Sequence, residues 1–447
     1  MTHCPQKLQT KCQVVTLLGK TAPGREDTSD ARCRNGRSIR SARAMAAYPS
    51  GLIPPPARWK GEARHVAVAD YEPEGLDVLM RLYYPTHERP PARWRRPLWV
   101  PTLAYSHGMM HFLFDFGDPK RSWWQRLLAR AAYIGGHVAT TLFDTLPVKE
   151  NAVPRSEKTM PVVIFSHGLA GTRNMYAALC TSLASQGFLV AALEHRDGSA
   201  SCASKIDDAG GVKHEPYVHT DGNFAWRREQ IDRRVREFSA AADALSRSPA
   251  PPRNVFPGSR FDPGTLAGLL DTSRLTAAGH SFGGATVLAA LSSVPSVKRA
   301  VLLDPWAVPF GPFPETAALE GAQEHPLRVA ARAGVPTFVM NSHGWDNVSD
   351  MAPLYRHAEA PWMECSVGGT RHQDFSDLPF RMPTLASQIG MKGKVNLHRL
   401  FDLKLGLLDV FFENVESEDA SGLESAVKAY AEGYRDEMQI RLKCAVP

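Results

Sequence analysis

A serine lies at the centre of a short glycine-rich sequence at residues 279–283 (GHSFG). The spacing matches G-x-S-x-G, in which small residues allow a sharp turn from a strand into a helix and expose the serine hydroxyl. An apolar run at 275–278 precedes this turn and a helical pattern at 282–294 follows it. These features predict that Ser281 is a nucleophile. The alternative is a glycine-rich turn that only packs a helix against a strand.

A histidine further along the chain could activate this serine. A serine hydroxyl is a weak nucleophile at neutral pH and needs a general base. In α/β-hydrolases the chain order is serine, then acid, then histidine. His372 ends a glycine-containing loop at 368–372 (GGTRH) that follows the last apolar strand, so we predict that it is the base. His398 lies in an apolar, helical stretch and is expected to be a surface or core residue.

Two aspartates compete for the role of the acid, which fixes the histidine tautomer and stabilises the imidazolium. Asp304 ends the first strand after the serine (VLLDPW), and Asp346 follows the second (FVMNSHGWDN). The acid often follows the later strand in this fold, so chain order alone favours Asp346. Chain order also allows Asp304 to be the acid. Whichever aspartate is not the acid would be an ordinary loop residue.

Backbone N–H groups must hold the negative charge that develops on an attacked carbonyl oxygen. One is expected from Phe282, directly after the serine, and another from an earlier loop that follows a strand. The loop 167–171 (HGLAG) follows a buried apolar run, and Leu169 is its predicted donor. A similar tripeptide at 106–108 (SHG) is a weaker candidate because no small-residue loop follows it.

The segments that must position these residues alternate between strands and helices. Strands are expected at 78–84, 161–166, 188–193, 275–278, 299–303, 336–340 and 363–367, and helices at 175–186, 224–245, 282–294 and 421–436. Strand–helix–strand order implies a parallel sheet. We therefore predict the α/β class, an α/β-hydrolase fold with a mostly parallel central sheet and helices on both faces. One catalytic domain with peripheral helices would cover residues 51–447, and residues 1–50 would form a disordered basic tail.

Composition limits the possible functions. The chain has 447 residues, is 43% hydrophobic and 22% charged, and contains no long uncharged apolar run, so it predicts a globular protein without a transmembrane helix. Seven cysteines without a C-x-x-C pair argue against a zinc site or a disulfide framework, and favour a reducing compartment. Neither a P-loop nor a dinucleotide motif occurs. We expect no cofactor and no metal.

The net charge of +6 is unevenly distributed. Residues 1–47 hold nine of the 52 Lys and Arg residues and three of the 46 acids, which leaves 43 of each in the remaining chain. The arginines at 227–236 alternate with acids on one predicted helix, a pattern typical of a solvated face rather than a nucleic-acid site. We therefore predict no nucleic-acid partner.

Longer stretches of the chain resemble the platelet-activating factor acetylhydrolase family, in particular its plasma and type II intracellular enzymes. The matching stretches are 165–200, 227–245, 279–287 (GHSFGGATV), 302–311 (LLDPWAVPFG) and 369–380 (GTRHQDFSDLPF). The run EHRD at 194–197 is the most distinctive. In it, Glu194 and His195 could bind a metal or act as an acid–base pair. Because no third ligand has a useful spacing, we expect them to order the loop near the site.

The resemblance implies an activity and a set of site residues. It implies a calcium-independent phospholipase A2-type enzyme that cleaves the sn-2 ester of platelet-activating factor and of phospholipids with short or oxidised sn-2 chains. It assigns Ser281 as nucleophile, His372 as base, and Leu169 and Phe282 as oxyanion donors. It also implies Asp304 as the acid, because the family's acid lies in this L-D-x-W context. The alternatives are a general carboxylesterase or polyester hydrolase of the same fold, and a non-catalytic lipid-binding protein on a hydrolase scaffold.

Two segments are candidates for contact with a phospholipid surface, either a membrane or a lipoprotein. Residues 121–134 place aromatic and apolar side chains on one helical face beside arginines, a composition typical of interfacial helices. The predicted lipid contacts are Trp123, Trp124, Leu127 and Leu128, with Phe380 and Leu385 from a second segment. The alternative is that both stripes are core faces.

The compartment does not follow from the resemblance. Residue 2 is Thr, whereas N-myristoylation of the type implied for the intracellular enzymes needs Gly. The start also lacks the apolar core of a secretory signal. We expect a cytoplasmic protein peripheral to membranes, with organelle targeting through the basic tail as the alternative.

Overall fold

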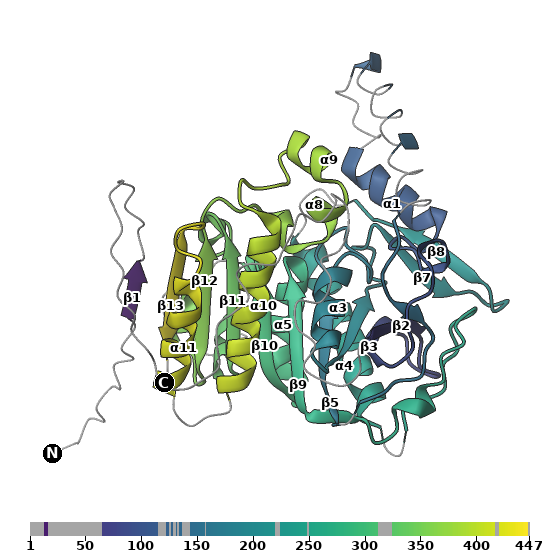
Figure 1. The fold of residues 1–447 in the computed structure, drawn as a ribbon, viewed down its shortest axis with the longest axis horizontal. Helices are drawn as coiled ribbons and strands as arrows, with labels where there is room; N and C mark the ends of the chain where they lie inside the picture. The colour runs from purple at the N-terminus through teal and green to yellow at the C-terminus, as the bar shows by residue number, and fades with distance from the viewer. Residues whose placement is uncertain are drawn as a thin grey trace.

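The computed structural model describes residues 13–16, 65–114, 122–124, 127, 131, 134–135, 144–156, 158–219, 224–247, 250–311, 324–415 and 420–445. Eleven strands form one central sheet (Figure 1). They are β1 (Gln13–Thr16), β2 (His65–Tyr71), β3 (Leu79–Thr86), β4 (Lys149–Glu150), β5 (Met160–Ser166), β6 (Leu189–Glu194), β9 (Leu270–His280), β10 (Val297–Leu303), β11 (Thr337–Ser342), β12 (Trp362–Val367) and β13 (Ile440–Ala445).

The strands lie in the order β1-β13-β12-β11-β10-β9-β5-β6-β3-β2-β4. The six central strands from β12 to β6 are parallel to their neighbours. The strands β13 and β3 flank them and run antiparallel to β12 and β6. The predicted mostly parallel sheet is thus confirmed. The carboxyl ends of its parallel strands meet at one edge, where the loops that follow β5, β9, β10 and β12 come together.

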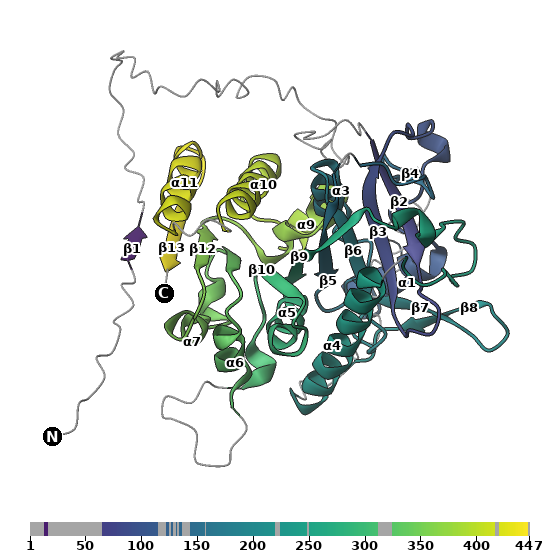
Figure 2. The same ribbon diagram turned by 90° about the horizontal axis from the view of Figure 1, so that it is seen from below.

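Helices cover both faces of the sheet (Figure 2). One face carries α3 (Ala177–Ser185), α10 (Leu397–Asn414) and α11 (Ala420–Glu432), and the other carries α4 (Phe224–Ser246), α5 (Phe282–Ser293), α6 (Pro326–Arg332) and α7 (Ala352–Arg356). Successive strand side chains point to opposite faces. In β5, Val163 and Phe165 accordingly join the core beneath α3 and α10, whereas Val162 and Ile164 join the core beneath α4 and α5. This double burial explains why the central strands are almost continuously apolar.

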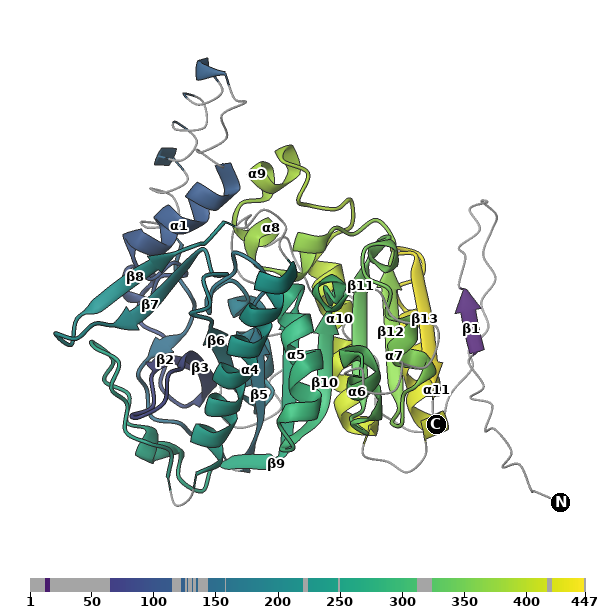
Figure 3. The ribbon, with the colours of Figure 1, turned by 180° about the vertical axis from the view of Figure 1, so that it is seen from behind.

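Further elements lie above the carboxyl edge of the sheet (Figure 3). They are α1 (Leu103–Phe114), α8 (Leu378–Arg381), α9 (Pro383–Gln388) and a separate hairpin of β7 (Cys202–Ile206) and β8 (Val212–Pro216). Five short 3-10 helices complete the described elements, namely η1 (Arg93–Arg95), η2 (Pro263–Leu266), η3 (Val308–Phe310), η4 (Trp345–Asn347) and η5 (His372–Phe375).

The flanking strands are the main departure from the predicted elements. Neither β2, β13 nor the β7–β8 hairpin was predicted, because these segments mix polar and apolar residues or pair antiparallel at the sides of the sheet. Within the predicted tail the structure describes only β1, which pairs with β13. The tail and the domain division therefore stay predictions. Among the described helices, none has the length and apolar character needed to cross a bilayer.

Candidate active site

The turn between β9 and α5 presents Ser281 in a strained backbone conformation. Its φ is 57° and its ψ is −119°, a region that non-glycine residues rarely adopt. Two glycines make this turn possible. A Cβ at Gly279 would lie 2.3 Å from the carbonyl oxygen of Gly283, and a Cβ at Gly283 would lie 2.0 Å from that of Ser166. The G-x-S-x-G spacing therefore reflects a steric requirement of the close approach between α5, β9 and the end of β5.

The loops after β10 and β12 bring Asp304 and His372 together. The Nδ1 atom of His372 donates to Oδ2 of Asp304 at 2.9 Å. The same carboxylate accepts the main-chain N–H of Ser342 at 2.6 Å and its hydroxyl at 2.7 Å. Burial raises the pKa of Asp304, although the hydrogen bonds from His372 and Ser342 act in the opposite direction. These contacts hold the carboxylate in place and leave the Nε2 atom of His372 available.

The other candidate acid lies elsewhere. Asp346 is in η4, is exposed, and pairs with Arg441 at 3.5 Å. Its neighbour Trp345 instead stacks flat on the His372 ring, with 4.1 Å between the ring centroids and an angle of 5° between the planes. The loop after β11 thus contributes an aromatic support for the histidine, and chain order alone would have selected the wrong residue of this loop as its partner.

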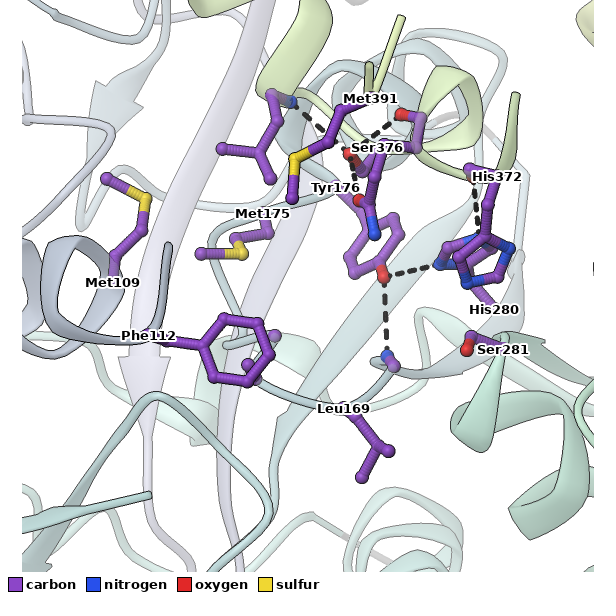
Figure 4. Close-up of a pocket in the computed structure, with 15 residues that line it drawn as sticks. Met109, Phe112, Leu169, Met175, Tyr176, His280, Ser281, His372, Ser376 and Met391 are labelled. Carbon is purple, nitrogen blue, oxygen red and sulfur yellow. Dashed lines mark hydrogen bonds between the residues drawn. The ribbon is translucent and has the colours of Figure 1, made fainter. Parts of the chain in front are cut away.

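His280, which lies between Gly279 and Ser281 in the motif, connects the loops around it (Figure 4). Its Nε2 donates to the main-chain oxygen of His372 at 3.1 Å, and its Nδ1 accepts the Tyr176 hydroxyl at 2.8 Å. The hydroxyl of Tyr176 in turn accepts the N–H of Gly168 at 3.3 Å. Burial lowers the pKa of His280 far below its usual value, so the ring stays neutral. No local motif indicated this role.

The N–H group of Leu169 lies between hydrogen-bonded N–H groups of the loop after β5. The N–H of Ala170 donates to Ser199, that of Gly171 donates to Gly168, and that of Gly168 donates to Tyr176. In the described part of the chain, the N–H of Leu169 has no acceptor. Leu169 and Ser281 line the same pocket, and Phe282 begins the helix directly after the serine. The geometry therefore brings the two predicted oxyanion donors to the predicted nucleophile.

The EHRD run at 194–197 anchors this loop through buried ion pairs. Glu194 contacts Arg173 and the hydroxyl of Tyr105, and Arg173 also pairs with Asp70 at 3.0 Å. The guanidinium of Arg196 pairs with Glu72 at 2.8 Å. These residues fix the end of β6 against β2, α1 and the loop before α3.

The other two residues of the run support the start of the loop 167–171, Asp197 through Arg234 and His195 at the end of β5. Asp197 pairs with Arg234 of α4 at 2.9 Å, and Arg234 also donates to the main-chain oxygen of His167 at 2.7 Å. His195 lies between the Ser166 hydroxyl at 2.7 Å and the Glu237 carboxyl at 2.6 Å. Burial raises the pKa of Glu237 to about 8 and lowers that of His195. The contacts agree with the expectation that Glu194 and His195 order the loop.

A pocket opens beside Ser281 and His372. Its apolar lining comes from Met109 and Phe112 of α1, Met175 before α3, Leu378 of α8 and Met391 (Figure 4). The elements above the sheet therefore form the walls of the site. An apolar pocket with a few polar groups at one end is typical of a site for an organic substrate.

The same polar residues are also the candidate metal ligands. Within the described residues, one group of three could hold a metal, and its members are His280, Asp304 and His372, with ligand atoms within 4.8 Å of one another. Hydrogen bonds already occupy both nitrogens of His280, Nδ1 of His372 and both oxygens of Asp304. These three residues are therefore linked in one network of hydrogen bonds.

The predicted lipid contacts fall into two groups. Trp123 and Trp124 are 64% and 58% exposed and stack on each other with 3.7 Å between ring centroids, and Leu127 is exposed nearby. Leu128 lies outside the described residues. Phe380 does not fit the surface expectation, because it is only 6% exposed and packs against Phe401 of α10. Leu385 is half-buried.

The fold and the serine-bearing turn define an α/β-hydrolase. A family model described as platelet-activating factor acetylhydrolase, isoform II, matches residues 67–419. The chain thus belongs to the platelet-activating factor acetylhydrolase family.

Individual relatives agree with this assignment, and a solved structure shares the fold. The platelet-activating factor acetylhydrolase of Canis lupus familiaris is 30% identical over 350 residues, which cover 75% of this chain and 70% of that protein. A putative phospholipase A2 of Schizosaccharomyces pombe is 26% identical over 406 residues, covering 78% and 88%. A ferulic acid esterase from Streptomyces cinnamoneus shares the fold, with a TM-score of 0.51, 17% identity and coverage of 84% and 98%.

Proposed function

We propose that this protein is a serine hydrolase that cleaves the sn-2 ester of platelet-activating factor and of phospholipids with short or oxidised sn-2 chains. The observation that carries the proposal is that Ser281 and His372 line one pocket, with Asp304 hydrogen-bonded to His372 behind it, within a chain of this family. The predicted charge stabilisation comes from backbone N–H groups, so the reaction is proposed to be calcium-independent.

The proposed mechanism proceeds through an acyl-enzyme. His372 accepts the proton of the Ser281 hydroxyl as its oxygen attacks the sn-2 carbonyl carbon. The N–H groups of Leu169 and Phe282 hold the resulting oxyanion. His372 then gives its proton to the departing lysophospholipid oxygen. It next activates a water molecule, which releases the acyl group as a carboxylic acid and restores the serine. Asp304 orients His372 throughout.

Replacing the nucleophile tests this mechanism. Ser281→Ala should abolish turnover and covalent labelling by an organophosphate, because no other hydroxyl lies in the strained turn. Labelling is measured by the mass of the intact protein. The matched control is Ser292→Ala, an exposed serine of the same helix, which should keep both properties. Labelling that persists in Ser281→Ala would refute the assignment.

A substrate panel separates the proposed function from the alternatives. Phosphatidylcholines that differ only in sn-2 chain length are compared with p-nitrophenyl acetate. Preference for the short-chain phospholipids supports the proposal, whereas efficient turnover of the simple ester alone indicates a general carboxylesterase. A protein that binds vesicles but is not labelled by the organophosphate would be a lipid-binding protein on a hydrolase scaffold.

A further inference from the structure

The loop that follows β11 contacts both members of the pair formed by His372 and Asp304. Ser342, at the end of β11, donates its main-chain N–H and its hydroxyl to the carboxylate of Asp304. Three residues later, the indole of Trp345 lies flat on the ring of His372, with 4.1 Å between the ring centroids and 5° between the planes. One short loop thus holds the carboxylate and covers a face of the imidazole.

The indole of Trp345 is itself fixed in place. Its side chain is half-buried, and its Nε1–H donates to the main-chain oxygen of Pro305 at 3.0 Å. Pro305 directly follows Asp304 in the chain. The indole is therefore anchored to the loop that carries the acid, which limits its rotation and keeps its face towards His372.

A flat stack of this kind favours the charged form of the imidazole. Two neutral aromatic rings prefer an offset or edge-to-face arrangement, because the face of an aromatic ring carries partial negative charge. A protonated ring is instead attracted to that face, and the indole of tryptophan attracts cations best among the aromatic side chains. The His372 side chain is 27% exposed, so water and salt screen this attraction less than they would at an open surface.

Other groups around His372 also act on its charge. The titratable and charged groups are Arg371 and Asp374 beside it in the chain, Asp304 after β10, His280 of β9, Asp346 of η4 and Lys404 of α10. Asp304 accepts from Nδ1 of His372, and its negative charge favours the protonated ring. The ring of His280 lies 4.4 Å from that of His372 and stays neutral, because burial lowers its pKa far below the usual value. Trp345 differs from all of these groups, because it acts through an uncharged ring face.

We propose that Trp345 is a positioning residue that orients the His372 ring for proton transfer and stabilises its protonated form during turnover. His372 carries the proton of Ser281 after the serine oxygen attacks the ester, and that of water when the acyl-enzyme is hydrolysed. The indole face stabilises both of these states relative to the neutral ring. This inference rests on the proposed serine-hydrolase mechanism, and it does not depend on which ester is the natural substrate.

The pH dependence of kcat/KM for p-nitrophenyl acetate tests the proposal. The acidic limb of this profile reports protonation of the base in the free enzyme. Trp345→Leu should move the midpoint of this limb to lower pH by about half a unit, because the protonated ring loses the indole face. Its kcat should fall roughly two- to fivefold. Trp345→Phe should lie between the two proteins, because a phenyl face attracts cations less strongly.

The direction of the shift separates this role from mere packing. A purely structural support would lower kcat and leave the midpoint unchanged, or raise it, because water that enters in Trp345→Leu solvates the protonated ring. An unchanged or higher midpoint in Trp345→Leu would therefore overturn the proposal. Trp362→Phe is the matched control, since Trp362 stacks on Tyr355 at 3.9 Å and begins β12, at the opposite end of this strand from the loop of His372. It should keep the wild-type midpoint.

A second measurement changes the charge of the ring face with little change in its shape. Growth on 5-fluorotryptophan replaces all nine tryptophans with a ring whose face attracts cations less strongly. The midpoint should move to lower pH in the wild-type sequence and stay fixed in Trp345→Phe, where position 345 has no indole. A shift of equal size in both proteins would contradict the role of Trp345.

Failure of the proposed function gives a different result. If the wild-type protein hydrolyses p-nitrophenyl acetate but no phosphatidylcholine, the phospholipid assignment fails, and the midpoints still decide the role of Trp345. If turnover is absent but an organophosphate labels Ser281, the pH dependence of the labelling rate is compared in the same variants. A wild-type protein that shows neither turnover nor labelling would overturn both proposals.

Discussion

The pairing of His372 with Asp304 rather than with Asp346 is the residue-level result with the clearest consequence. Asp304→Asn should lower kcat by roughly 10⁴, because an amide at this position favours the wrong imidazole tautomer. The measurement is the steady-state rate with a short-chain phospholipid. Asp346→Asn is the matched control and should cost little, since the side chain of Asp346 is exposed and pairs with Arg441 rather than with His372 among the described residues. Equal losses in the two variants would contradict the assignment.

The buried His167 gives a prediction about pH and stability. Burial and the nearby Arg234 lower its pKa to about 3, so the folded protein keeps the ring neutral while the unfolded chain binds a proton near pH 6.5. The stability that neutral His167 contributes is present above pH 6.5 and is lost as the pH falls. The advantage of the wild type over His167→Gln in free energy of unfolding should therefore shrink by about 2 kcal/mol between pH 6.5 and 5.

Urea unfolding of both proteins at several pH values measures this difference. Comparing the two proteins removes the contributions of other groups, such as Glu237, whose pKa of about 8 acts in the opposite sense. A constant difference across the range would show that His167 titrates normally in the folded state.

The candidate catalytic residues could be predicted from the sequence more readily than the residues that support them. Ser281 and His372 follow strands and carry local signals, whereas the roles of His280 and Trp345 depend on contacts between loops distant in sequence. Spacing could not rank Asp304 above Asp346, because the acid's identity depends on where His372 lies in space. Only the family resemblance made that choice in advance.

At the level of elements, the turn between β9 and α5 depends on the absence of a side chain at Gly283. Gly283→Ala should destabilise the protein by about 3 kcal/mol and reduce activity, because its Cβ would overlap the carbonyl oxygen of Ser166. Thermal unfolding and ester turnover measure both effects. Gly433→Ala is the control, since the nearest atom to its Cβ would be 3.7 Å away. A Gly283 variant with wild-type stability would contradict this steric account.

The exposed tryptophan pair gives a second element-level prediction. Replacing both Trp123 and Trp124 by Ala should weaken binding to phospholipid vesicles several-fold while sparing hydrolysis of a soluble ester, because aromatic rings anchor helices at lipid interfaces. Vesicle co-sedimentation measures binding. Trp94→Ala is the matched control, an exposed tryptophan in η1. Unchanged vesicle binding in the double variant would reject the predicted contact.

The strands could be predicted from the sequence where burial alone determines the pattern of apolar residues. Strands such as β6 are buried along their whole length and read as apolar runs. The strand β13 mixes Arg441 and Lys443 with apolar residues, and only its place beside β12 makes it a strand. The prediction that Phe380 contacts lipid was wrong. An apolar stripe on a helix has the same sequence pattern whether it packs against lipid or against another helix such as α10.

For the whole molecule, the charge distribution predicts how binding to an anionic surface depends on salt. Residues 1–47 carry the entire net charge of +6. Binding of the full chain to anionic vesicles should weaken as salt is raised from low to physiological concentration, since the salt screens exposed charges. Deletion of residues 1–47 should leave weaker binding with little salt dependence. Ester turnover confirms that the shortened protein is folded, and an unchanged salt dependence would contradict the prediction.

The methionine wall of the pocket has a chemical consequence beyond substrate fit. Met109, Met175 and Met391 face the space in which the acyl chain would be cleaved. Peroxides convert methionine into the polar sulfoxide, which no longer packs as an apolar side chain. The oxidants that damage lipids can therefore also damage this wall. We expect peroxide treatment to lower turnover in step with sulfoxide formation at these positions, and methionine sulfoxide reductase to restore it.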